Sequence, residues 1–306
     1  MHANGSFIRT ALERIRFYTD EADGDAKYTN SYLVNHVLMP CVTEVITQLN
    51  LDADNPIMAT FTITPEANIA NYILPPDIQM VLQVAKRDSK GNLQWSAFPR
   101  GTLNPRGPGF YFDGNTLVLQ PAPTSTLESF DITYVPAGGA CLALAETGTT
   151  FSRSGSGSTA IDTVTLPASP TYGLVDHRPN AYVGSIVRIL SSTLWEERVC
   201  TAYDYATRTL TLRTPLTAVP ASNTTVEVCP LWCMQPLWEA VALSGAMKFG
   251  TAKNLSGPKM AALRIQYSKA MKSIGDISAN IQSITGKYFD RNTTSRLGIN
   301  YGAPLF

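Results

Sequence analysis

Charged residues, histidines and long apolar runs are all scarce in this sequence of 306 residues. Charged residues make up 16% of it, and the only histidines are His2, His36 and His177. Globular domains usually contain about 25% charged residues. No run approaches the roughly 18 apolar residues of a transmembrane helix, and the first residues lack the apolar core of a signal peptide. We therefore expect no membrane span and no signal peptide.

Cysteines are few and irregularly spaced. They are Cys41, Cys141, Cys200, Cys229 and Cys233. Their odd number and irregular spacing do not indicate a disulfide framework. Cys229 and Cys233 could supply two thiolates, but no histidines lie at metal-ligand spacing beside them. We expect reduced thiols in a protein assembled in a cytosol, with no metal site and no cofactor.

Sequence signatures of enzymes are also missing. Residues 154–158 (Ser-Gly-Ser-Gly-Ser) lack the spacing of a nucleophile elbow, and residues 245–251 space two glycines as a P-loop does but lack its lysine. His177 lies between Asp176 and Arg178 in a polar turn, where a solvated side chain is the simpler interpretation. Adjacent Glu196 and Glu197 would point to opposite faces of a strand. We expect no enzyme, although a distant pair of carboxylates, as in a polysaccharide hydrolase, stays open.

The formal net charge is zero, but the charges are separated along the chain. Residues 1–60 hold four Lys/Arg against eight Asp/Glu, whereas residues 245–306 hold nine against two. An acidic beginning and a basic end predict complementary surfaces or a negatively charged partner. The alternative is a set of solvated helix faces of opposite sign.

The N-terminal region has helical periodicity. Apolar residues recur at helical spacing from Ile8 to Ile15, with Arg9, Glu13 and Arg16 on the other face. The acidic stretch 20–25 ends this helix. A second helix should begin near Thr29 or Asn30, with a kink at Pro40, because a proline inside a helix costs about 3 kcal/mol.

The central region, residues 57–230, is rich in Val, Ile, Thr, Tyr and Phe between frequent turn signals. The strands we predict here are 58–63, 81–86, 93–98, 110–112, 117–120, 130–135, 164–166, 185–190, 198–203, 209–213 and 225–228. Residues 148–159, rich in Gly, Ser and Thr, are interpreted as a flexible loop between two sets of strands. Short strands at this spacing are typical of a sandwich or a small barrel.

Helices return after Pro230. Small residues between Ala242 and Gly250 would allow close packing of one helix, and a second helix should run from Gly257 to Gly275. The predicted fold is therefore α+β: a helical bundle from residues 1–56 and 231–275, and a β-sandwich or β-barrel insertion of residues 57–230. The insertion could form two lobes with a break near 140–160. Residues 276–306 would form an extended C-terminal arm that becomes ordered on a partner.

This layout resembles the head–tail connector, or portal-adaptor, proteins of tailed phages, including the podovirus tail tubular protein A group. The likeness lies in the N-terminal helical pair through 28–49, in the β segments 71–78, 112–123 and 132–136, and in the C-terminal helices with their tail. Residues 140–230 depart from it, because they form a larger second β lobe that looks like a small barrel module of phage tail parts.

The resemblance implies a structural virion protein that forms a ring, expected to be a dodecamer. The ring would dock on the portal protein, join it to a tail nozzle or tube protein, and let DNA pass through its channel. The acidic turn and the basic end are hypothesised to meet across subunits or at the portal. The candidate interface residues are Asp20, Glu21, Asp23, Asp25, Lys287, Tyr288, Phe289, Arg291, Arg296, Leu305 and Phe306. A β-rich virion protein that binds a receptor or carbohydrate is the alternative.

Overall fold

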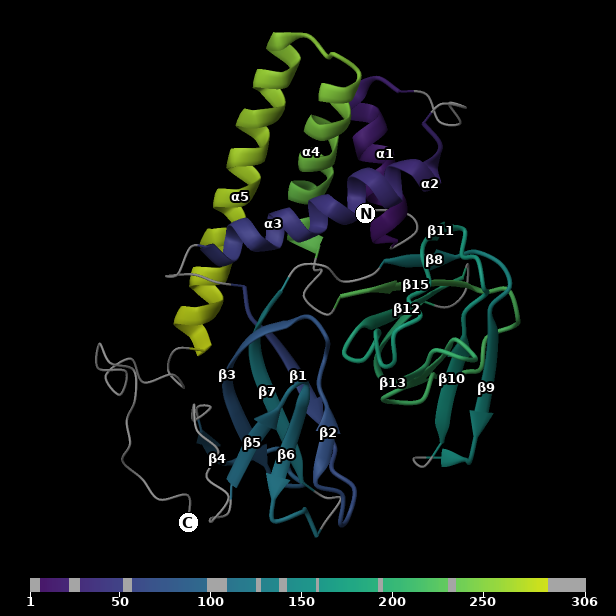
Figure 1. Ribbon diagram of the computed structural model, residues 1–306, viewed down its shortest axis with the longest axis vertical. Helices are drawn as coiled ribbons and strands as arrows, with labels where there is room; N and C mark the ends of the chain where they lie inside the picture. The colour runs from purple at the N-terminus through teal and green to yellow at the C-terminus, as the bar shows by residue number, and fades with distance from the viewer. Residues whose placement is uncertain are drawn as a thin grey trace. The chain divides into compact units, whose positions relative to one another are not determined.

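The computed structural model describes residues 6–21, 28–51, 57–97, 109–124, 128–137, 142–157, 160–191, 195–230 and 235–285 (Figure 1). The chain is mixed α+β, as the sequence predicts: N-terminal helices pack against C-terminal helices, and a region of several sheets lies between them in the sequence. The chain divides into two compact units. The first contains residues 1–48, 75–77 and 137–271, and the second contains 49–74, 78–136 and 272–306.

Helix α1 (Phe7–Thr19) packs against α4 (Gln235–Ala252) in the first unit. Ser6 caps α1 by accepting a hydrogen bond from the backbone N–H of Arg9. A Cβ added to Gly245 of α4 would lie 2.6 Å from Cδ1 of Ile15. The small residues of α4 therefore do allow close packing, as predicted, and the two ends of the chain share one core.

The second N-terminal helix contains three parts, α2 (Asn30–Leu33), a π-helical turn η1 (Val34–Leu38) and α3 (Met39–Leu51). Its start is where the sequence predicts it, since the Thr29 side chain caps the first turn. The π turn ends at Leu38, two residues before Pro40. Because proline has no N–H and its ring crowds the preceding turn, a local widening of the helix accommodates it.

Helix α5 (Gly257–Thr285) is longer than predicted. The expected end at Gly275 is wrong, because the helix continues through it. A glycine inside a helix costs about 1 kcal/mol relative to alanine but does not end the helix unless it adopts a left-handed conformation. The first ten residues assigned to the arm are therefore helical. No helix in the described residues is long and apolar enough to cross a membrane.

The first unit also contains an eight-stranded antiparallel sheet, with strand order β11-β8-β15-β12-β13-β14-β10-β9. Its strands are β8 (Ala143–Ala145), β9 (Thr150–Ser154), β10 (Ile161–Thr165), β11 (Tyr172–Gly173), β12 (Ile186–Leu190), β13 (Trp195–Asp204), β14 (Thr209–Leu212) and β15 (Thr225–Cys229). Buried residues along these strands form one hydrophobic core around Val187, Tyr203 and Val226.

Strand β9 corrects the prediction of a flexible loop over 148–159. Thr150–Ser154 pairs in register with β10, and Arg153 lies opposite Asp162. The Gly/Ser composition suggested a linker, but a cross-strand ion pair and the half-buried Phe151 stabilise a strand there. Contacts with residues outside the segment, and not its composition, therefore determine its conformation.

The second unit contains a four-stranded sheet of order β1-β7-β3-β4 and a three-stranded sheet of order β2-β6-β5. Its strands are β1 (Ala59–Ile63), β2 (Asn71–Ile73), β3 (Ile78–Arg87), β4 (Leu93–Ala97), β5 (Gly109–Asp113), β6 (Thr116–Gln120) and β7 (Ser129–Pro136). Buried and less buried residues alternate along β1 and β6, which gives each strand one core face. Every strand listed in the sequence prediction has its counterpart in the two units, with ends shifted by a few residues.

Candidate interaction surface

Helix α1 has a buried face and an exposed face in the first unit. Ile8, Ala11 and Ile15 are fully buried, whereas Glu13 is exposed and 77% of Phe17 is exposed. Arg16 was placed on the exposed face by the sequence pattern, and this was wrong. Its guanidinium donates to the Tyr28 carbonyl at 2.8 Å and to Asn30, so the side chain is buried and holds the start of α2.

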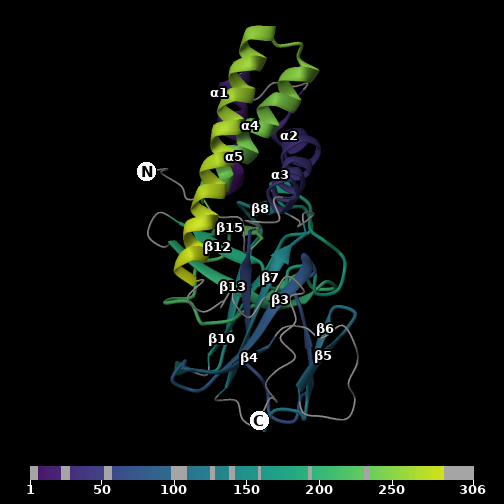
Figure 2. The same ribbon diagram turned by 90° about the vertical axis from the view of Figure 1, so that its left-hand side faces the viewer.

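Helices α1 and α5 run side by side with α4 (Figure 1 and Figure 2). An open groove lies between the end of α1 and the first turns of α5. Its volume is about 530 Å³, and its lining residues are Arg16, Phe17, Tyr18, Asp20, Glu21, Lys259, Ala262, Leu263 and Gln266. Tyr18 packs against the small core cluster of Leu243, Ala246 and Leu263. The groove therefore has an apolar base with polar rims.

Two of the predicted interface residues lie on this groove. Asp20 forms an ion pair with Lys259, and Glu21 forms one with Lys253. The acidic turn and the basic C-terminal region thus meet within one chain. More than half of each side chain of the Asp20–Lys259 pair is exposed, so it stabilises the fold by at most about 1 kcal/mol.

The other predicted interface residues lie outside the described residues. They are Asp23, Asp25, Lys287, Tyr288, Phe289, Arg291, Arg296, Leu305 and Phe306. Their proposed contacts with portal or with neighbouring subunits stay predictions.

The part of α5 in the first unit is mostly exposed. Between residues 257 and 271, Leu263 alone is buried, and 58% of Ile265 is exposed. Arg264 and Lys269 are exposed and form no ion pair with any described residue. Helices of this length usually bury an apolar stripe to be stable. The exposed face of α5 therefore combines unpaired positive charge with a large aliphatic side chain.

The start of α1 is attached to the sheet of the same unit by a buried carboxylate. Glu227 of β15 is fully buried and accepts hydrogen bonds from the Ser6 hydroxyl at 2.8 Å and from the backbone N–H groups of Phe7 and Ile8 at 3.0 and 2.8 Å. Arg188 of β12 pairs with the same carboxylate at 3.2 Å and lies over the ring of Trp238, 5.1 Å from its centre. This network neutralises the charge and satisfies the orphan N–H groups of α1.

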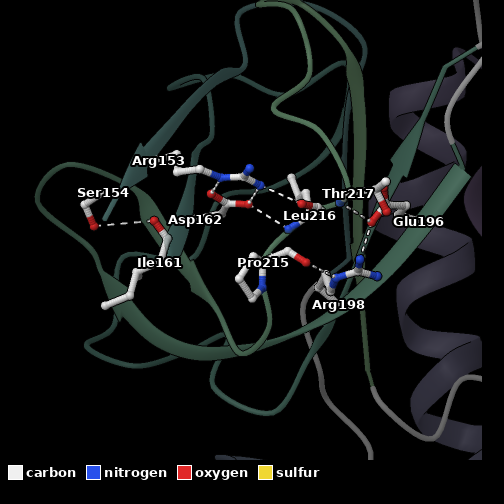
Figure 3. Close-up of polar contacts among 9 residues, drawn as sticks. All are labelled: Arg153, Ser154, Ile161, Asp162, Glu196, Arg198, Pro215, Leu216 and Thr217. Carbon is white, nitrogen blue, oxygen red and sulfur yellow. Dashed lines mark hydrogen bonds and ion pairs between the residues drawn. The ribbon is translucent and has the colours of Figure 1, made fainter. Parts of the chain in front are cut away.

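A second polar network holds the loop after β14 (Figure 3). Arg153 donates two hydrogen bonds to Asp162, at 2.7 and 2.6 Å, and Asp162 accepts another from the backbone N–H of Leu216 at 2.7 Å. The Arg153 hydrogen bond lowers the pKa of Asp162 below its ordinary value. Figure 3 shows that these groups converge on one another and on the loop backbone. These hydrogen bonds hold the loop in place, so we interpret the network as structural and call it the Asp162–Arg153 clamp.

The carboxylates Glu196 and Glu197 of β13 point to opposite faces, as predicted. Glu196 is buried, pairs with Arg198 and accepts from the backbone N–H of Thr217 at 3.1 Å (Figure 3). Glu197 pairs with Arg188 instead, at 2.6 Å. The two side chains therefore do not share a site.

Cys41, Cys200 and Cys229 are buried free thiols. Burial raises the pKa of the Cys41 thiol and raises that of Cys200 to about 12. His177 is exposed in its turn, where Asp176 pairs with Arg178. Within the described part of the chain, no three His, Cys, Asp or Glu side chains are close enough to hold a metal ion. Cys141 and Cys233 lie outside it.

Comparisons with models of protein families, with curated proteins and with solved structures found no match. We therefore infer function from the residues and geometry of this chain.

Sequence reasoning missed Phe17 and Glu227. Phe17 follows Glu13 by one helical turn, so an aromatic residue on the charged face was a signal that could have been used. Glu227 sits inside the apolar run of β15 with valines on both sides. A lone carboxylate in such a run indicates a buried partner, but the sequence does not say which one.

Proposed function

We propose that this chain is a structural subunit of a tailed-phage particle, a ring-forming adaptor that docks on the portal and links it to the tail nozzle or tube. It would assemble in the host cytoplasm, become part of the virion, and surround the DNA without reading its sequence. A dodecameric ring is the expected assembly, since the resemblance to portal adaptors implies it.

The packing of α1 against α4 is the observation that carries this proposal. The close approach of Gly245 to Ile15, and the contact of Phe7 with Trp238 at 5.4 Å between ring centres, join the two ends of the chain in one helical body. The resemblance to portal adaptors depends on such a body with a β-rich insertion between its helices. A chain whose ends folded separately would not support it.

The buried Glu227 network also favours a structural role. A subunit that connects a head to a tail must transmit force without deforming. Glu227 and Arg188 link the first turn of α1 to two central strands through hydrogen bonds that are shielded from water. Shielded charge-assisted hydrogen bonds are stronger and less sensitive to salt than exposed ones.

The first test is binding of the purified chain to portal rings from the same phage genome. We expect the chain to form a stable complex with portal that shows a second ring below it in electron micrographs. Failure to bind portal under all tested salt conditions would contradict the adaptor function.

A truncation would then test the C-terminal arm. Because α5 continues to Thr285, the appropriate deletion removes 286–306 and leaves the helix intact. We expect the truncated chain to lose affinity for portal, because the aromatic and aliphatic residues of the segment would anchor it. The control is Leu174→Asp, an exposed position in the second β lobe. Equal affinity of the truncated and full chains would exclude the arm as the docking element.

A further inference from the structure

The helical part of the first unit carries two different exposed faces. The first, the α1 groove, has Phe17 and Asp20 on one rim and Lys259, Ala262 and Gln266 of α5 on the other, and the exposed Glu13 lies one helical turn before Phe17. The second, the α5 ridge, consists of Ala261, Arg264, Ile265, Ser268 and Lys269. With about 100° of rotation per residue, Ile265 lies about 60° from Ala262 and about 100° from Gln266 around the helix, so the two faces are neighbours. One helix therefore contributes to both faces.

We propose that the α5 ridge of one copy of this chain docks into the α1 groove of the next copy. Ile265 would pack on Phe17 above the base formed by Tyr18 and Leu263. The inference rests on the proposed function, because it names the surface through which the subunits of the ring join.

The apolar part of the argument is the exposure of Phe17 and Ile265. They are 77% and 58% exposed, the largest values for large apolar residues on α1 and on residues 257–274 of α5. Exposed single residues are common, but here each one lies beside an open groove or along a poorly covered helix. A helix that places an aliphatic ridge in an apolar groove is a common mode of recognition.

Charge selects the pairing between these faces. Asp20 of the α1 groove is already paired with Lys259, so the unpaired carboxylate beside the groove is Glu13, whereas the α5 ridge carries Arg264 and Lys269. Glu13, Arg264 and Lys269 form no ion pair within the described residues, so their charges are open to a partner. Contact between two α1 grooves would bring the unpaired Glu13 side chains of two copies toward each other, and contact between two α5 ridges would bring their Arg264 and Lys269 side chains together. Opposite signs favour groove against ridge.

Pairing of two unlike faces is a heterologous contact. Each copy then uses its ridge on one side and its groove on the other, so copies add in one direction. They close into a ring if the rotation between neighbouring copies brings the last copy back to the first. A symmetric dimer would use both faces at once and stop growing.

A mixing experiment tests this arrangement with the full chain. Phe17→Asp disables the groove and Ile265→Asp disables the ridge, and both positions are exposed, so folding should be retained. Circular dichroism and thermal melts check this. Leu174→Asp, at a position 57% exposed on the second β lobe, is the matched control. Particle mass is measured by native mass spectrometry at increasing protein concentration.

We expect the wild type and Leu174→Asp to assemble, and each of the two disabled variants to stay monomeric. An equal mixture of the disabled variants should form a one-to-one dimer and nothing larger, since it contains one intact ridge and one intact groove. Assembly of either variant alone at wild-type levels overturns the proposal, as does a mixture that stays monomeric. A wild-type chain that remains monomeric at the highest attainable concentration overturns it too.

Failure of this inference differs from failure of the proposed function. If rings form, bind portal and are unaffected by both substitutions, the adaptor function stands and the groove–ridge contact is wrong. If the mixture forms its dimer but neither it nor the wild type binds portal, the contact stands and the adaptor function is wrong.

Discussion

The carboxylate of Glu227 accepts the backbone N–H of Ile8 at a distance of 2.8 Å, although the two residues are 219 positions apart in the sequence. This hydrogen bond joins the first turn of α1 to strand β15. The same carboxylate is paired with Arg188, so the helix start, the strand and the cation form one buried unit.

Replacement of Glu227 by alanine should therefore destabilise the first unit strongly. The change leaves two backbone N–H groups buried without their acceptor and leaves the buried Arg188 paired with Glu197 alone, and loss of one partner of a buried ion pair costs about 3–5 kcal/mol. Urea unfolding followed by tryptophan fluorescence measures the loss. The control is Glu197→Ala, which removes the partly exposed partner of Arg188 and should cost much less. Equal effects of the two changes would show that burial of Glu227 is not what matters.

Gly245→Ala should destabilise the α1–α4 packing. Its Cβ would lie 2.6 Å from Cδ1 of Ile15, and overpacking of this kind costs about 1–3 kcal/mol, against a gain of about 1 kcal/mol in helix propensity. Ile15→Val removes that methyl group, so the double variant should recover part of the loss in a double-mutant cycle of unfolding free energies. Gly257→Ala, where an added Cβ meets nothing within 4 Å, is the control. Strictly additive effects would argue against direct contact between Gly245 and Ile15.

The Asp162–Arg153 clamp should make stability dependent on acid pH. Because the pKa of Asp162 is lowered in the folded chain, its contribution is fully present above the unfolded pKa of about 3.9 and is lost as pH falls through the folded pKa. Asp162→Asn should thus be less stable than wild type at pH 7, by about 1–3 kcal/mol, and the difference should shrink toward pH 2. Urea unfolding across this range is the measurement. Arg153→Met should also weaken the dependence of the unfolding free energy on pH. A difference between wild type and Asp162→Asn that stays constant at all pH values would contradict the role of the ion pair.

The buried thiols should be unreactive in the folded chain. Reaction of a cysteine requires its thiolate, and burial raises the pKa of Cys41 and raises that of Cys200 to about 12. Brief treatment of the folded chain with a thiol reagent should leave Cys41 and Cys200 unlabelled, and treatment in denaturant should label both. Peptide mapping measures the labelling of each cysteine. Phe17→Cys introduces a thiol at an exposed position and should be labelled at once. Rapid labelling of Cys200 without denaturant would show that its strand opens readily.

The sequence by itself determined the fold class and the order of elements. Alternating Val, Ile and Thr residues indicated the strands, and residues Ile8 to Ile15 indicated the buried side of α1, because burial of an apolar face depends on a local period. Thr29 at the start of α2 was also predicted, since capping involves only the next turn.

Only the tertiary structure decided how distant residues combine. It made a strand of Thr150–Ser154 by placing Arg153 opposite Asp162, and it buried Arg16 against Tyr28 and Asn30. It also placed Phe17 beside Ala262 on one groove and Glu227 at the start of α1. The preference of a residue for one backbone conformation over another amounts to about 1 kcal/mol or less. A single buried ion pair or a few packing contacts from elsewhere in the chain therefore outweigh it.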